Sequence, residues 1–183
     1  MFSLILCGSL LPWASCILLS PRDAITVAAI DQLGSLFSFS LDEKNFAALA
    51  DVYTANAIID GGGPNPLRGL PAIQAFYRQT FSNSSLVTEH TVTTVYAYNF
   101  TATTAKSKNY ADAFYFGKPA QERGGFLFRN QSVVFRERFD NEYVKEKNGA
   151  WKISRQTGPK PIVGFCHIIR RIFVLTLFVI IVS

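Results

Sequence analysis

His90 is one of two histidines in the chain, and it opens a stretch rich in Thr, Val and Tyr that is typical of a β-strand. Histidine changes its charge near neutral pH, so it is a suitable base for removing a proton from a carbon acid. Such a base needs a partner that holds its tautomer, and Asp112 is predicted to be that partner. The alternative is a surface or capping role for His90. The second histidine, His167, lies in a separate C-terminal segment.

Asp112 lies within a strongly apolar stretch. Strict alternation along a strand places it on one face with three aromatic side chains: Tyr110, Phe114 and Phe116. A carboxylate on such a face is costly unless it is paired, which favours a position beside His90 in a pocket that Tyr110 and Phe114 also line. A strand bulge would turn Asp112 outward, and Tyr115 would then take its place in the pocket.

Glu137 and Asn141 are two further candidates, on the last long stretch of strand-like composition. Alternation places them on one face with Val133, Phe135, Phe139 and Tyr143. Asn141, or alternatively Tyr110, is predicted to donate a hydrogen bond to a ligand carbonyl, and Glu137 would be an unusual acid among aromatic residues. A register shift of one residue would put Arg138 and Asp140 in these places.

The elements that position these residues are helices first and strands later. A stripe at three- and four-residue steps predicts a helix from Thr26 to Leu41, and Asp42 is predicted to be the N-cap of a second helix. Pro71 is predicted to begin a third helix, with Ile73, Phe76, Tyr77 and Phe81 as its buried side. Strands are predicted at 86–98, 101–116 and 126–143, and Asn148-Gly149 predicts a hairpin. This order predicts an α+β fold with helices on one face of an antiparallel meander.

The two ends of the chain are more apolar than its middle. Residues 1–20 have the length and texture of a secretory signal peptide, with a buried first helix as the alternative. Residues 25–161 are predicted to form a single domain. Residues 162–183 are predicted to be a membrane segment, a lipid-anchor signal or an extension foreign to the domain. The expected location is therefore outside the cell or on a membrane, reached through the secretory pathway.

Three N-glycosylation sequons, at Asn83, Asn99 and Asn130, favour the same route. The three cysteines all lie in the end segments, so neither disulfides nor thiolate metal sites are expected in the domain. The net charge of +5 is scattered rather than gathered in a basic stripe, which argues against a nucleic-acid partner. No metal site is predicted.

Several short strings resemble the SnoaL-like branch of the nuclear transport factor 2-like superfamily. They are Asp42-Glu43-Lys44-Asn45-Phe46, Leu67-Arg68-Gly69 before Ala72-Ile73, Thr88-Glu89-His90, and Phe139-Asp140-Asn141-Glu142-Tyr143 before the Asn148-Gly149 hairpin. The resemblance covers residues 25–158. It implies a cone-shaped curved antiparallel sheet packed on three N-terminal helices, around a mostly apolar pocket.

The resemblance also implies a function. Many members are dehydratases, isomerases or polyketide cyclases that need no cofactor, while others only bind small ligands or form homodimers. His90 matches the catalytic histidine of the scytalone dehydratase-like members, and Asp42 matches a functional aspartate. Leu41 and Gly61 stand where those enzymes carry tyrosines, which puts that particular reaction in doubt. Two functions are therefore expected in parallel: a lyase or isomerase for a small hydrophobic carbonyl compound, and a non-catalytic carrier of small hydrophobic ligands. A structural domain whose own aromatic side chains fill the pocket is a third.

Overall fold

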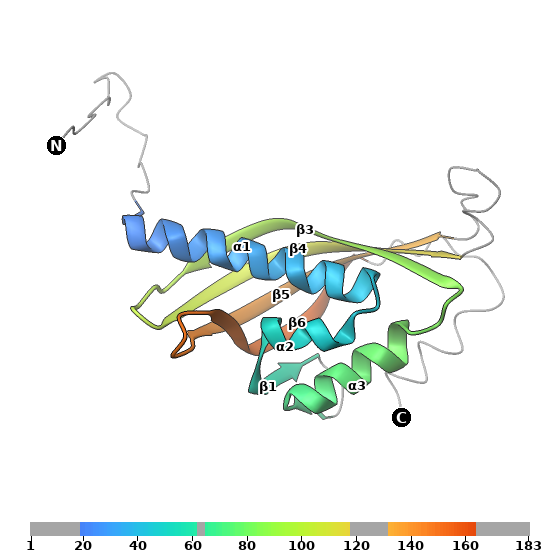
Figure 1. The fold of residues 1–183 in the computed structure, drawn as a ribbon. Helices are drawn as coiled ribbons and strands as arrows, with labels where there is room; N and C mark the ends of the chain where they lie inside the picture. The colour runs from blue at the N-terminus through green and yellow to red at the C-terminus, as the bar shows by residue number, and fades with distance from the viewer. Residues whose placement is uncertain (1–18, 62–64, 118–131, 164–183) are drawn as a thin grey trace, which may run out of the picture.

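A computed structural model describes residues 19–61, 65–117 and 132–163 (Figure 1). In chain order the elements are α1 (Pro21–Asp42), η1 (Phe46–Ala48), α2 (Leu49–Val52), β1 (Tyr53–Asp60), β2 (Leu67–Arg68), α3 (Leu70–Phe81), β3 (Leu86–Tyr98), β4 (Thr104–Gly117), β5 (Ser132–Lys145) and β6 (Trp151–Val163). Most of the expected signal peptide, the Asn130 sequon and the tail beyond residue 163 lie outside the described residues.

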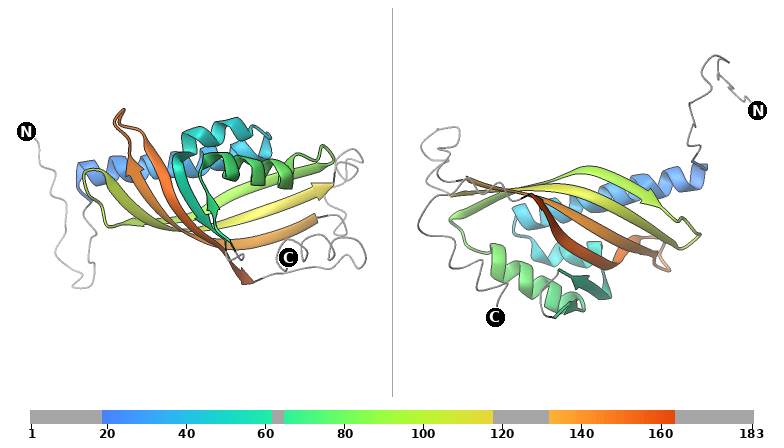
Figure 2. Two further views of the ribbon diagram at one scale, coloured as in Figure 1. Left: turned by 90° about the horizontal axis from the view of Figure 1, so that it is seen from below. Right: turned by 180° about the vertical axis from the view of Figure 1, so that it is seen from behind.

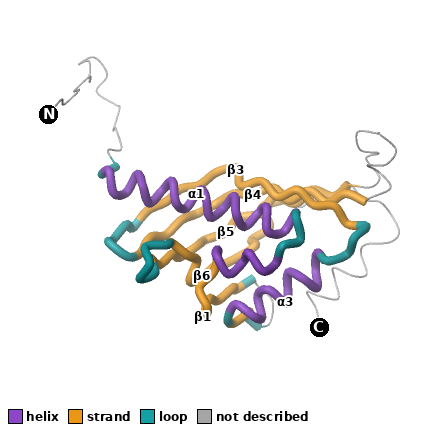
Figure 3. The backbone as a smooth tube through the Cα atoms, viewed as in Figure 1, coloured by secondary structure: helices purple, strands orange, loops and turns teal. Residues whose placement is uncertain are grey.

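The strands form one six-stranded sheet in the order β2-β1-β6-β5-β4-β3. Neighbouring strands are antiparallel except β1 and β6, which run parallel. The helices gather on one face of this curved sheet, and the view from behind shows the opposite face without a helix (Figures 2 and 3). The predicted α+β architecture is therefore confirmed, with β3 to β6 as the antiparallel meander.

Helix α1 begins at Pro21, before the predicted start at Thr26. The Ser20 side chain accepts a hydrogen bond from the backbone N–H of Asp23, and proline in the first turn has no N–H that needs a partner. Within the described part of the chain, α1 alone is long and apolar enough to cross a membrane, with a mean hydropathy of 1.4. A core helix passes the same test, and α1 lies against β3 and buries Ile30 and Leu41 in the core.

The turn after α1 differs from the expectation. Asp42 is the last residue of α1 rather than the N-cap of a second helix, and Asn45 precedes η1. Lys44 adopts a left-handed conformation with φ 58°, and its Nζ donates to the carbonyl oxygens of Phe81 at 2.6 Å and Leu86 at 2.9 Å. These bonds tie the end of α1 to the start of β3, so the Asp42 carboxylate is held against that strand.

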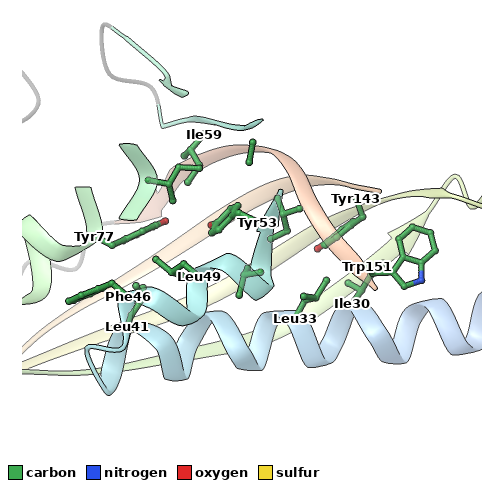
Figure 4. Close-up of a cluster of buried hydrophobic side chains, with 14 of the residues drawn as sticks. Ile30, Leu33, Leu41, Phe46, Leu49, Tyr53, Ile59, Tyr77, Tyr143 and Trp151 are labelled. Carbon is green, nitrogen blue, oxygen red and sulfur yellow. The ribbon is translucent and has the colours of Figure 1, made fainter. Parts of the chain in front are cut away.

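The core lies between the helices and the concave face of the sheet (Figure 4). It includes Leu49 and Val52, both 0% exposed, together with Tyr53, the first residue of β1. On α3, Ile73, Tyr77 and Phe81 are buried as predicted, whereas Phe76 is 36% exposed. The ring of Phe76 packs only edge-on against Tyr77, on the solvent side of the helix.

Register shifts in β3 and β6 bend the long strands. One lies between Val92 and Thr94, at the middle of β3. The predicted hairpin joins β5 to β6, and its Gly149 has φ 87°, a conformation that favours glycine. The bends curve the sheet around α1 and leave room between the sheet and the helix.

Candidate functional site

Asp42 and His90 meet at the end of α1. The Asp42 Oδ1 lies 2.6 Å from His90 Nδ1, and its Oδ2 accepts the backbone N–H of His90 at 2.9 Å. Thr88 adds a hydroxyl hydrogen bond of 2.8 Å to Oδ1. The carboxylate therefore fixes both the backbone and the ring of His90.

The charge state of Asp42 decides which ring nitrogen carries the proton. Burial alone raises the pKa of this carboxyl, but the hydrogen bonds from His90 and Thr88 outweigh it, so the pKa lies below the ordinary value of 3.8. An ionised carboxylate only accepts hydrogen bonds, so the proton of the neutral imidazole sits on Nδ1. Nε2 then has a free lone pair, and no described residue is hydrogen-bonded to it. This is the arrangement of a histidine held ready as a base.

His90 lines a pocket between α1 and the sheet. The wall residues are Gly34, Phe37, Ser38, His90, Val92, Asn109, Ala111, Ala113, Glu137, Phe139, Asn141, Tyr143, Ile153 and Gln156. The hollow has about 550 Å³ of empty space with its open mouth included, but only about 50 Å³ admits the centre of a water molecule. That is room for a few waters, so a bound ring would fill the pocket or widen it.

Glu137 is the acidic residue of this wall, and the prediction that it shares a face with Phe139, Asn141 and Tyr143 is confirmed. It is paired across β4 and β5 with Ala111. Burial raises the pKa of its carboxyl above the ordinary value of 4.5, and the nearby His90 lowers it by a smaller amount.

A chain of hydrogen bonds organises the other end of the pocket. Ser107 donates to Asn109 Oδ1 at 2.8 Å, so the Tyr143 hydroxyl must donate to Ser107 Oγ, 2.9 Å away. Asn141 Nδ2 in turn donates to the Tyr143 hydroxyl at 3.1 Å. The Asn141 Oδ1 is buried and has no hydrogen-bond partner among the described residues. In this arrangement Asn141 offers a ligand an acceptor, not the donor that the sequence led us to expect.

Three predicted site residues lie on the opposite, convex face of the sheet. Asp112 is not the partner of His90: it forms a two-bond ion pair with Arg136, both bonds 2.8 Å long. Tyr110 is 42% exposed, and Phe114 stacks on Phe116 at 6.3 Å. The alternation was correct, but the convex face carries this aromatic row, and β4 contributes Asn109, Ala111 and Ala113 to the pocket wall.

Tyr115 takes the inner position that the alternative assigned to it. Its ring meets His90 edge-on at 5.9 Å and stacks on Phe81 at 6.0 Å. Gly34, Asn109 and Gln156 also contribute to the wall and were not predicted. For Asn109 and Gln156 the only signal is the sheet register, which places Asn109 opposite Phe139 and Gln156 opposite Asn141.

Asn83 and Asn99 are exposed, at the starts of the loops before and after β3. A search of the described residues finds no cluster of His, Cys, Asp or Glu that could hold a metal ion.

Comparisons with known proteins agree on one group. The family model described as the SnoaL-like domain matches residues 22–157. No curated protein matches this chain. Among solved structures, a candidate scytalone dehydratase from Novosphingobium aromaticivorans DSM 12444 is 16% identical with a TM-score of 0.63, over 76% of this chain and 86% of that one.

Two further structures share the fold. A hexachlorocyclohexane dehydrochlorinase (LinA type 2) is 19% identical with a TM-score of 0.61, over 78% of this chain and 93% of that one. A protein from Catenulispora acidiphila in complex with S-DNPA is 16% identical with a TM-score of 0.60, over 73% of this chain and 91% of that one. Their likeness supports the fold, which is the nuclear transport factor 2-like one.

Proposed function

This chain belongs to the SnoaL-like domain family, and we propose that it is a cofactor-independent lyase or isomerase in which His90 removes a proton from a small hydrophobic carbonyl compound. The observation that carries the proposal is the 2.6 Å contact between His90 Nδ1 and Asp42 Oδ1. It supports a neutral imidazole with its Nε2 lone pair free for a substrate proton.

Asp42 is the positioning residue in this proposal. It accepts from the backbone N–H of His90 as well as from the ring, so a substrate proton arriving on Nε2 produces an imidazolium beside a carboxylate. The ion pair stabilises the charge that develops during proton removal.

The pocket supports a substrate with an apolar body and at least one polar group. Phe37, Phe139 and Val92 supply apolar contact near His90. The unpartnered Oδ1 of Asn141 supports a ligand hydroxyl or N–H at the far end, because a buried acceptor without a partner is unfavourable. Two structural relatives are named for eliminations, a dehydration and a dehydrochlorination, and a third was solved with a small molecule bound.

The test uses the full-length chain with a library of small aromatic and alicyclic carbonyl compounds. Binding is followed by the rise in Tm, and conversion by mass and absorbance, for the wild type and His90→Gln. A compound that stabilises both proteins but is converted only by the wild type supports the lyase. Conversion that is unchanged in His90→Gln would contradict it.

A non-catalytic carrier of small hydrophobic ligands is the second candidate. It is favoured by Leu41, which is 1% exposed within the core and offers no hydroxyl where the dehydratase-like enzymes have a tyrosine. A carrier predicts stabilising ligands that are recovered unchanged from the wild type.

The secretory route is part of the proposal. Exposed sequon residues Asn83 and Asn99 are compatible with glycosylation. When the protein is expressed in a secretory host, treatment with a glycosidase should increase its mobility on a gel. The double variant Asn83→Gln with Asn99→Gln should show a smaller increase in mobility. Residues 162–183 are proposed to attach the domain to a membrane. A fractionation experiment would test this proposal against the two alternatives, a lipid-anchor signal and an extension foreign to the domain.

A homodimer through the convex sheet face is also proposed. This face presents Tyr96, 58% exposed, and Tyr110 without a helix over them. Exposed aromatic side chains of this size are common at interfaces.

A further inference from the structure

Glu137 and His90 project into the same pocket from strands that are not neighbours. The registers pair His90 with Ala113 across β3 and β4, and Ala111 with Glu137 across β4 and β5. Side chains of directly paired residues lie on the same face, so both residues face α1. They are about two strand spacings (~10 Å) apart across the sheet and two residues (~7 Å) apart along it. Between them β4 presents only the methyl groups of Ala111 and Ala113, which leaves the gap open.

The Glu137 carboxyl has no hydrogen bond or ion pair with any other described residue, although it is largely withdrawn from solvent. The titratable groups that influence or face it are His90 on β3, Tyr115 on β4 and Tyr77 on α3. Helix α1 and strand β6 contribute only uncharged side chains to the pocket wall. Asp42 is bonded to Nδ1 of His90. Among the described residues, His90 is the only cationic group that acts on Glu137, and desolvation favours the neutral acid.

We propose that Glu137 is the general acid of this site and protonates a leaving hydroxyl group while His90 removes the proton from the adjacent carbon. This inference rests on the proposed function and narrows it to the dehydration of β-hydroxy carbonyl compounds. Hydroxide is a poor leaving group, so elimination from such a substrate is accelerated by a proton donor that reaches the leaving oxygen.

The step balances without another reactant. His90 Nε2 takes the proton from the carbon next to the carbonyl group, and the electron pair of that C–H bond forms the C=C bond. The C–O bond breaks, and the leaving oxygen takes the Glu137 proton and departs as water. A proton then passes from His90 to the Glu137 carboxylate through water, which restores both groups.

The first test measures whether Glu137 holds its proton. The full-length chain is labelled with carbon-13 at the glutamate carboxyl groups, and the Glu137 resonance is identified by its loss in Glu137→Gln. It is expected to titrate at a pH above the ordinary glutamate value of 4.5. Titration at or below that value would overturn the inference whatever the protein does to substrates.

The second test separates acid from base catalysis by the leaving group. The aldol of acetone with benzaldehyde and its acetate ester eliminate to the same coloured enone, but only the aldol needs a proton on its leaving group. His90→Gln is expected to slow both eliminations, whereas Glu137→Gln should slow the aldol at least ~100-fold and the ester less than ~3-fold. Glu142→Gln, on the convex face of the same strand, is the matched control.

The outcomes distinguish the two proposals. Equal slowing of both compounds by Glu137→Gln, or no slowing of the aldol, would overturn the general acid while leaving His90 as the base. A wild-type chain that converts neither compound would count against the proposed function itself and would remove the inference with it.

Discussion

The carboxylate of Asp42 lies 2.6 Å from the ring of His90, although the two residues are 48 positions apart in the chain. The bond joins the C-terminal end of α1 to the start of β3. It is therefore both a tertiary contact and the orienting element of the candidate base, and a change at Asp42 affects stability and chemistry together.

Asp42→Asn is expected to lower the free energy of unfolding by about 1.5–3 kcal/mol at pH 7, because charge-assisted bonds to His90 and Thr88 are lost. The Asp42 pKa is lower in the folded chain than its ordinary 3.8, so the ionised form stabilises the fold above that pH and the effect disappears as the pH falls below it. Denaturant unfolding between pH 3 and 7 checks this. Asp112→Asn, in an exposed pair with Arg136, should change stability by less than about 1 kcal/mol.

Glu137→Gln is expected to stabilise the fold at pH 8. The pKa of Glu137 is raised above 4.5 in the folded chain, so its contribution to stability is complete below that pH and is lost as the pH rises through the folded value. Removing the charge should raise the free energy of unfolding at pH 8 by more than about 0.5 kcal/mol, beyond the usual range of a surface substitution. At pH 4 the gain should vanish. Glu142→Gln, which breaks only an exposed pair with Lys106, should change the free energy of unfolding at pH 8 by less than about 0.5 kcal/mol.

Gly34→Ala is expected to separate stability from ligand binding. Gly34 lies within α1, where alanine is favoured over glycine by about 0.5–1 kcal/mol, and a Cβ there would meet Val92 Cγ2 at 3.4 Å without severe overlap. The same methyl group would occupy part of a pocket of about 50 Å³. We expect an equal or higher Tm and a weaker Tm shift with any ligand of the wild type. Unchanged ligand binding would contradict the assignment of the pocket.

Tyr96→Arg with Tyr110→Arg is expected to convert the proposed dimer to a monomer, because like charges would face each other across the convex surface. Sedimentation velocity over a concentration series measures the change. Phe39→Arg is the control, since Phe39 is 61% exposed but lies on α1, on the helical side of the sheet. A wild-type chain that sediments as a monomer at all concentrations would refute the dimer.

Much of the architecture followed from local patterns. Periodicity identified α1 and α3, strand composition identified the meander, and Asn148-Gly149 marked its last turn, because each signal lies within a few residues of the structure it produces. Asp42 shows that local patterns do not predict contacts between distant parts of the chain. An aspartate before an apolar stripe has the local features of an N-cap, and its partner His90 belongs to an element that no local signal connects to it.

The site residues divide in the same way. Alternation correctly grouped Glu137 with Asn141, and Asp112 with Tyr110 and Phe114. Which group faced the pocket depended on the register between β4 and β5, and the 14 residues from 118 to 131 that join them are too long to fix it as a tight turn would. Because Tyr110, Phe114 and Phe116 are aromatic, the sequence wrongly indicates that their face of β4 points toward the pocket. Arg136 is found opposite Asp112 only once that register is known.

The parallel pairing of β1 with β6 has a consequence for biosynthesis. Tyr53 and its hydrogen-bond partner Gln156 are separated by 103 positions, and β6 is the last strand of the domain. While the chain is being translated, β1 and α2 can join the long strands of the sheet only after β6 has left the ribosome, because β1 otherwise pairs only with the two-residue strand β2. Until then their apolar side chains are open to chaperones and proteases, so a nascent chain arrested before residue 151 should remain sensitive to proteolysis whereas the released domain resists it.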